Sequence, residues 1–194
     1  SYRQSITNAE AIWSQNGLEV RIGGESIPAT AGHTTLLDMT PGSRGLANIP
    51  SVTNTPYATM YDAALAIGRT YSDAEANIHV TPVKKGGTTP ESLDVVLNYG
   101  PFPGNRAPVA AISPATLAVT AGVPQTFSVS ASDPDGDALT YYWEFDDPDA
   151  LGGNAAGNTN PDARLSTQGS HIWTRNGTFL VRCTVTDMKG NKTI

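Results

Sequence analysis

Apolar and polar residues alternate along several short stretches of the chain, with turn-forming residues between them. In the second half, the alternation is clearest in stretches that read TLAVTAG, QTFSVSAS, LTYYWEF and TFLVRCTVTD. A period of two residues is typical of a strand that has one face in a core and the other in solvent. The pattern predicts four or more strands in residues 105–194, as in a small β-sandwich.

The first half contains more stretches of the same kind. They read GLEVRIGG, TTLLDMTPGS, ALAIGRTYSD, ANIHVTPV and SLDVVLNYG, with Gly, Pro, Asn or Asp close to their ends. Short strands between such turns predict a second all-β domain. The expected fold class is therefore all-β, with two consecutive β-sandwich domains.

A stretch rich in proline and glycine, NYGPFPGNRAPVAAI at 98–112, separates the two halves. Proline favours extended backbone and blocks helix continuation, so a short, stiff linker is expected here. The boundary is placed near Asn105, which gives domains 1–104 and 105–194. Both ends of the chain read as strand, so we expect a piece of a longer protein.

The alternation also predicts which side chains are buried. In LTYYWEF, it places Tyr141, Trp143 and Phe145 on the core face and Tyr142 on the opposite face, where it is a candidate for surface contact. Cys183 lies in an apolar strand and predicts a buried, unreactive thiol. Further aromatic candidates for surface contact are Trp173 and Trp13.

Composition narrows the range of partners. The formal net charge of −6 disfavours a nucleic-acid partner, which calls for a basic face. No apolar run approaches the length of about 18 residues that a membrane-spanning helix needs, so no membrane span is expected. A monomer is expected.

The sequence contains no catalytic motif that we can identify. The histidines are His33, His79 and His171, and none belongs to an HExxH motif. No nucleophile elbow or phosphate-binding loop is present either. The three histidines lie in strand-like or loop text, and a zinc site built by all three stays open as an alternative. For Asp146, Asp147 and Asp149, a catalytic carboxylate pair stays open as an alternative to a solvated turn. We expect no catalytic residue, no zinc and no enzyme activity in this chain.

Residues 133–137 read DPDGD and offer carboxylates at 133, 135 and 137. Oxygen ligands at such short spacing suit Ca²⁺. An EF-hand loop does not fit, because Gly136 occupies the fourth position where the sixth is required. The alternative is a turn between two strands, in which the aspartates cap their own backbone. Both interpretations stay open at this point.

The motifs of the second half resemble a known family. NRAPVA, SASDPDGDALTYYWEF, SHIW, NGTF and VRCTVTDMKGN follow, in order, the pattern of the PKD (polycystic kidney disease) domain. Residues 143–147 stand where the family has WDFGD, 171–173 where it has HxY, and 176–179 where it has PGTY. The resemblance covers 105–194, with an insertion of about ten residues after Asp149. Against the family pattern most of the last strand is missing, so we expect this strand to be truncated at Ile194. It implies an immunoglobulin-like β-sandwich.

This resemblance also implies a calcium site. PKD domains of secreted bacterial collagenases look similar and bind calcium near the linker. The matching residues here are Asn105, Asp133 and Asp187, with Asp135 nearby. One ion would tie the linker to two turns at the same end of the sandwich. The alternative is a plain turn, in which Asp187 makes backbone hydrogen bonds.

Residues 1–100 resemble a second family. The order SYRQSI, NGLEVRIGG, TTLLDMTPGS, DAALAIGRTYSDAEANIHVTPV and LDVVLNYG is similar to the β-domain that follows the catalytic domain of gametolysin-like (M11-type) secreted zinc metallopeptidases. The resemblance implies the non-catalytic C-terminal region of a secreted, extracellular bacterial metalloprotease, with the HExxH domain upstream. This region would act as a spacer or contact the parent hydrolase's protein or polysaccharide substrate. The alternative is an accessory PKD-containing region of a carbohydrate-active enzyme or a cell-surface adhesin.

Overall fold

The computed structural model describes residues 17–23, 34–37, 39, 64–87, 92–147 and 160–194. These residues form strands and loops, which confirms the predicted all-β class. A search of this described part for helices with the length and hydrophobicity of a membrane span finds none. The chain divides into two compact units, Ser1–Ala66 and Ile67–Ile194, and each is described by itself.

In the first unit, the described residues form two short antiparallel strand pairs. One joins β1 (Gly17–Leu18) to β4 (Leu65–Ala66), and the other joins β2 (Arg21–Gly23) to β3 (Thr34–Leu36). All four lie in stretches where the sequence predicted strands.

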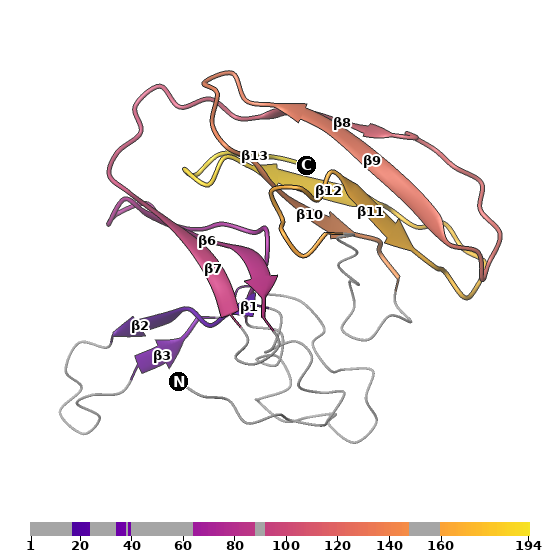
Figure 1. Cartoon of the computed structure of the whole chain (residues 1–194), viewed down its shortest axis with the longest axis horizontal. Coiled ribbons are helices and arrows are strands. Elements are labelled where there is room, and N and C mark those ends of the chain that lie inside the picture. The colour runs from indigo at the N-terminus through magenta and orange to yellow at the C-terminus, as the bar shows by residue number, and fades with distance from the viewer. Residues whose placement is uncertain (1–16, 24–33, 38, 40–63, 88–91, 148–159) are drawn as a thin grey trace. The chain divides into compact units, whose positions relative to one another are not determined.

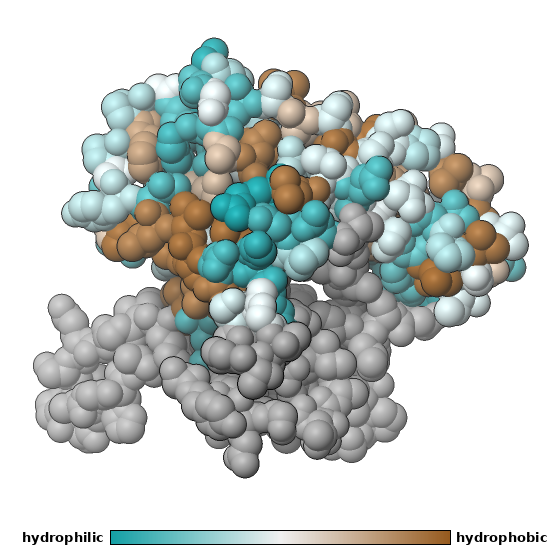
Figure 2. Space-filling model, in the orientation of Figure 1, coloured by the Kyte–Doolittle hydropathy of each residue, from teal (hydrophilic) through white to brown (hydrophobic). Residues whose placement is uncertain are grey.

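The second unit begins with an antiparallel sheet of three strands in the order β5-β6-β7. The strands are β5 (Tyr71–Asp73), β6 (Ile78–Gly86) and β7 (Ser92–Tyr99). Val95, Leu97 and Tyr99 are exposed and share one face of β7, because alternate residues of a strand point the same way. Figure 2 shows hydrophobic side chains gathered over this part of the molecule.

The described residues between 109 and 194 form two further antiparallel sheets of three strands each (Figure 1). The first has the order β11-β9-β8, with β8 at Val109–Ser113, β9 at Gln125–Ser132 and β11 at Gln168–His171. The second has the order β10-β12-β13, with β10 at Thr140–Glu144, β12 at Arg182–Thr186 and β13 at Lys192–Thr193.

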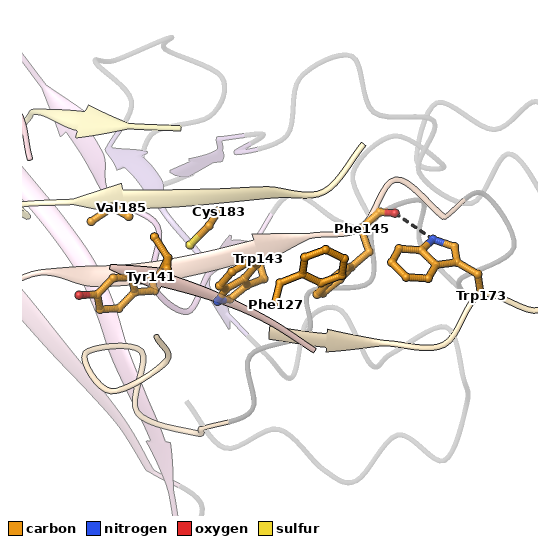
Figure 3. Close-up of a cluster of buried hydrophobic side chains, with 8 residues drawn as sticks. Phe127, Tyr141, Trp143, Phe145, Trp173, Cys183 and Val185 are labelled. Carbon is orange, nitrogen blue, oxygen red and sulfur yellow. Dashed lines mark hydrogen bonds between the residues drawn. The ribbon is translucent and has the colours of Figure 1, made fainter. Parts of the chain in front are cut away.

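Aromatic side chains from both sheets fill the core between them (Figure 3). Phe127 comes from β9, while Tyr141, Trp143 and Phe145 come from β10 and the residue after it. The last three are buried as the alternation predicted. The Trp143 indole N–H donates to the Ser166 carbonyl at 3.0 Å, so its polar tip is satisfied within the core.

Two of the aromatic residues predicted to make surface contacts are buried instead. Tyr142 is only 8% exposed and Trp173 only 3%. The segment before β5 covers the outer face of β10, where the Arg69 guanidinium lies 5.5 Å from the Tyr142 ring centroid. Trp173 stacks on Phe179 and donates its indole N–H to the Phe145 carbonyl at 3.2 Å (Figure 3). The expectation that Tyr142 lies on the surface was therefore wrong.

Strand positions differ from the prediction at one edge of the sandwich. The stretch TLAVTAG at 116–122 forms no strand, and β8 lies in the stretch expected to be linker. Val119 nevertheless packs against the core, so the alternation in TLAVTAG reflects burial without strand pairing. Similarly, the strand predicted over TFLVRCTVTD begins only at Arg182.

Candidate metal centre

Two loops of the second unit begin with an aspartate whose carboxylate accepts hydrogen bonds from backbone N–H groups further along the same loop. Asp133 follows β9, and its Oδ1 accepts hydrogen bonds from the N–H groups of Asp135 at 2.8 Å and Asp137 at 3.2 Å. These are the capping bonds that the turn interpretation of DPDGD predicted.

Asp187 follows β12 and repeats this arrangement. Its Oδ1 accepts from the N–H groups of Lys189 at 2.7 Å and Asn191 at 3.0 Å. In both loops, one carboxylate oxygen caps the residues two and four positions on, so the second oxygen is free to face another group.

A left-handed glycine shapes the first loop. Gly136 has φ of 78°, which residues with a Cβ rarely adopt, and its N–H donates to the Asp133 carbonyl at 3.2 Å. The chain therefore turns back at this point instead of continuing as a strand. This turn brings Asp137 back to the side of Asp133.

Three carboxylates meet where the loops approach each other. One oxygen each of Asp133, Asp137 and Asp187 lies within 4.8 Å of the other two. Calcium ligands lie about 2.3–2.6 Å from the ion, so two ligands on opposite sides are about 5 Å apart. The spacing of the three oxygens thus suits a single Ca²⁺ ion.

The Oδ2 atom of Asp133 is buried and unpartnered, and it is the strongest indication that the cluster binds a cation. It has less than 1 Å² of accessible surface and no hydrogen-bond partner among the described residues. A buried polar atom without a partner costs about 1–3 kcal/mol, because it has lost its hydration and gained nothing. A cation at this position would satisfy it, and carboxylate oxygens are the ligands that Ca²⁺ prefers. The residues present therefore fit the ion that the PKD resemblance implies.

Asn105 connects the linker to the second loop. Its side-chain N–H donates to Asp187 Oδ2 at 2.7 Å, and its carbonyl accepts from the Asn191 side chain at 3.0 Å. The structure thus brings together three of the four metal ligands predicted from the sequence, namely Asn105, Asp133 and Asp187.

The fourth predicted ligand, Asp135, has a different partner. Its Oδ1 accepts from Arg106 Nε at 2.9 Å and Nη2 at 2.7 Å, and its Oδ2 from the Arg106 backbone N–H at 2.7 Å. The side-chain hydrogen bond from Arg106 is the main cause that lowers the pKa of Asp135. Asp137 takes its place in the carboxylate cluster. Asp137 is one of the DPDGD acids, but it was not among the predicted metal ligands.

The clustered carboxylates repel one another and need positive charge nearby. At an effective dielectric constant of about 20, each pair at this separation is unfavourable by roughly 3 kcal/mol. The ammonium group of Lys189 contacts Asp137 Oδ1 and forms an ion pair with it. The hydrogen bond from Lys189 to Asp137 within this ion pair is the main cause that raises the pKa of Lys189.

The other acids and histidines considered for catalysis have separate partners. His79 shares a hydrogen bond of 2.9 Å with Ser72 Oγ, and His171 one of 2.7 Å with Asp147 Oδ2. Asp146 Oδ2 accepts from the Leu180 N–H at 3.3 Å. His33 and Asp149 lie outside the described residues, and so does Trp13, the third aromatic residue predicted to make surface contacts.

The single cysteine is buried, as predicted. Cys183 is 6% exposed and belongs to the aromatic core. Burial raises the pKa of its thiol to about 12, so the thiol stays protonated at neutral pH.

A comparison with family models identifies the second half of the chain. The model of the PKD domain matches residues 105–194. This segment carries a PKD domain. The match covers the residues from which the resemblance was inferred, so that prediction is confirmed. Neither the search of curated proteins nor the search of solved structures finds a match.

The match supports a general role for residues 105–194. PKD domains are non-catalytic, immunoglobulin-like modules of an accessory or binding type. The resemblance of residues 1–100 to the M11-type β-domain stays a prediction, and so does the boundary near Asn105.

Proposed function

We propose that this chain is the non-catalytic C-terminal region of a secreted bacterial metallopeptidase and that it acts chiefly as a spacer. The PKD domain at 105–194 supports an accessory role, and PKD domains occur in extracellular proteins. The order of motifs in residues 1–100 supports a zinc metallopeptidase as the parent enzyme. The coding sequence upstream of Ser1 tests this parentage: an HExxH domain is expected, and a glycosidase domain would favour the alternative.

Two observations favour a spacer over a module that contacts substrate through the predicted aromatics. Tyr142 and Trp173 are buried and offer no contact surface. The loop that begins at Asp187 also holds the strand before the linker, because the Asn98 side chain donates to the Met188 carbonyl at 2.8 Å. The loop that begins at Asp187 is thus hydrogen-bonded to Asn98 before the linker and to Asn105 at the start of the PKD domain. Such bonds suit a spacer that keeps two domains at a fixed angle.

The proposal includes a Ca²⁺ ion held by Asp133, Asp137 and Asp187, beside Asn105. The buried, unpartnered Oδ2 of Asp133 carries this part of the proposal. The ion would supply the positive charge that three clustered carboxylates require. The chain's own residues do the rest: the two capped loops fix the carboxylates, and Asn105 fastens the linker to them.

Calorimetric titration with Ca²⁺, together with thermal unfolding in calcium and in chelator, tests the site. We expect binding of one ion and a rise in Tm, because a ligand that binds only the folded state stabilises it. At a free concentration of 100 times Kd, the gain is about 2.7 kcal/mol. Asp133→Ala should abolish both the heat and the rise.

Asp135→Ala is the matched control, since it removes a carboxylate from the same loop but outside the cluster. It should bind Ca²⁺ nearly as well as the wild-type chain. If the wild-type chain gives neither heat nor a shift in Tm, DPDGD is a turn and nothing more.

A further inference from the structure

Lys189 reaches into the carboxylate cluster from the loop that follows β12. Its backbone N–H donates to Asp187 Oδ1 at 2.7 Å, which fixes the base of the side chain beside the cluster. Its ammonium group contacts Asp137 and lies 5.3 Å from the centroid of the Phe102 ring. The side chain of Asp137 is 14% exposed and that of Lys189 30% exposed, so the pair is partly withdrawn from water.

The ammonium group interacts with the whole cluster. Asp137, Asp187 and Asp133 all act on Lys189 and raise its pKa, with the hydrogen bond to Asp137 as the largest cause. Lys189 therefore supplies one positive charge among three carboxylates, in the place where a metal ion would supply two. It leaves Asp133 Oδ2 without a partner.

We propose that Lys189 is a tethered counter-ion, which holds the three carboxylates together when no metal ion is bound and which a divalent cation must displace from Asp137 in order to bind. This inference rests on the proposed calcium site. A calcium ion bound by the three carboxylates would bring two further positive charges close to the ammonium group that contacts Asp137 Oδ1, and the two cations would repel each other.

A Lys189 side chain displaced from Asp137 can still interact with the Phe102 ring. The face of the Phe102 ring is within reach of the ammonium group, and a cation over an aromatic ring is attracted to it. Phe102 lies in the stretch between β7 and β8, three residues before Asn105. Loss of the bond to Asp137 therefore does not leave Lys189 without favourable contacts.

Lys189 then lowers the affinity for metal and raises the stability of the metal-free protein. Lys189→Met removes the competitor and keeps a side chain of similar length. We expect it to bind Ca²⁺ about tenfold or more tightly than the wild-type chain, since a hydrogen bond to a charged group must no longer be broken. In chelator the same variant should melt at a lower temperature than the wild-type chain, because the carboxylates repel one another without compensation.

The experiment is a calorimetric titration of the whole chain with Ca²⁺ alone, paired with thermal unfolding in chelator and in calcium. Lys192→Met is the control for net charge, because Lys192 lies on the neighbouring strand β13 and is exposed. Its affinity and Tm should stay close to the wild-type values. Opposite effects of Lys189→Met on affinity and on the Tm in chelator distinguish a competitor from a residue that only supports the fold.

Lys189→Gln is measured in parallel, in case the methionine variant does not fold without calcium. Glutamine keeps a hydrogen-bond donor but has no charge, and it should also bind Ca²⁺ more tightly. If the wild-type chain binds and both variants bind equally or more weakly, the counter-ion role is wrong while the calcium site stands. If none of the three proteins binds Ca²⁺, both proposals fall.

Discussion

Asp162 is held ionised by the arginine two positions further along the chain. Arg164 donates to Asp162 Oδ1 through Nε at 2.8 Å and to Oδ2 through Nη2 at 2.6 Å. These bonds are the main cause that lowers the pKa of Asp162 from its ordinary value of 3.8. The turn at 162 is anchored as well, since the Ser166 hydroxyl donates to the Asp162 carbonyl at 3.1 Å.

The lowered pKa predicts how stability depends on pH. The folded state holds the proton more weakly than the unfolded state, so the pair contributes stability above about pH 4, and this contribution is lost as pH falls through the folded-state pKa. Asp162→Asn should lower Tm at pH 7, and its difference from the wild-type chain should shrink as pH falls below 4. Calorimetric unfolding from pH 7 to pH 2.5 measures this. Glu75→Gln, at an exposed turn, should run parallel to the wild-type chain.

At the residue scale, the sequence predicted part of the candidate site. The PKD motifs pointed to Asn105, Asp133 and Asp187, and the structure brings these three residues together, because each stands at a fixed place beside a strand or the linker. They did not distinguish Asp135 from Asp137. That choice depends on the left-handed turn at Gly136 and on Arg106, which lies 29 positions before Asp135 and captures its carboxylate.

At the scale of elements, the packing of β11 against β10 requires a residue without a side chain. A Cβ added at Gly169 would lie 2.5 Å from Cγ and Cδ2 of Trp143 and 3.0 Å from Cζ of Phe145. Trp143 does not move aside easily, since it is fully buried and its indole is bonded to the Ser166 carbonyl. Overpacking of this kind typically costs about 1–3 kcal/mol.

Gly169→Ala should therefore reduce the free energy of unfolding by about 2–3 kcal/mol, measured by urea denaturation. Gly86→Ala is the matched control in another strand, where an added Cβ meets only the Ser92 hydroxyl oxygen at 3.3 Å. Its effect should stay within about 1 kcal/mol, since a flexible side chain can give way. Equal losses in the two variants would contradict a packing constraint specific to β11.

The strands themselves were predicted best where alternation and a ladder partner coincide. β7 and β10 match their predicted stretches closely. The segment 116–122 alternates without pairing, because Val119 turns to the core while its backbone lies outside the sheet. Tyr142 was misplaced for a related reason. Alternation indicates two faces of a strand, but not that a distant segment covers the second face.

At the scale of the whole molecule, the second compact unit extends beyond the PKD domain. The family match begins at Asn105, whereas the unit begins at Ile67. Backbone bonds join the two parts: the Ala163 N–H donates to the Val83 carbonyl at 2.7 Å. A hydroxyl bond adds to them, from Thr140 Oγ1 to the Gly68 carbonyl at 3.0 Å. No sequence motif predicted these contacts, since three of the four groups that form them are backbone groups, which any residue carries.

These contacts predict that the PKD domain is more stable with the preceding sheet than without it. In a fragment of residues 105–194, the N–H of Ala163 and the hydroxyl of Thr140 lose their partners, and Tyr142 loses the segment that covers it. With about 1 kcal/mol for each hydrogen bond and more for the uncovered ring, we expect the fragment to be less stable than residues 67–194 by about 2–4 kcal/mol.

Urea denaturation of the two fragments at the same calcium concentration measures this difference in stability. Tryptophan fluorescence is a suitable signal, because Trp143 and Trp173 both lie in the PKD core. A single transition for residues 67–194 at a higher urea concentration would mean that the sheet β5-β6-β7 and the sandwich unfold together. Equal midpoints would instead mean that the PKD domain is an independent unit from Asn105 onward. In that case the contacts between the sheet β5-β6-β7 and the PKD domain do not stabilise the PKD domain. A spacer of fixed angle would then have to depend on the metal centre alone.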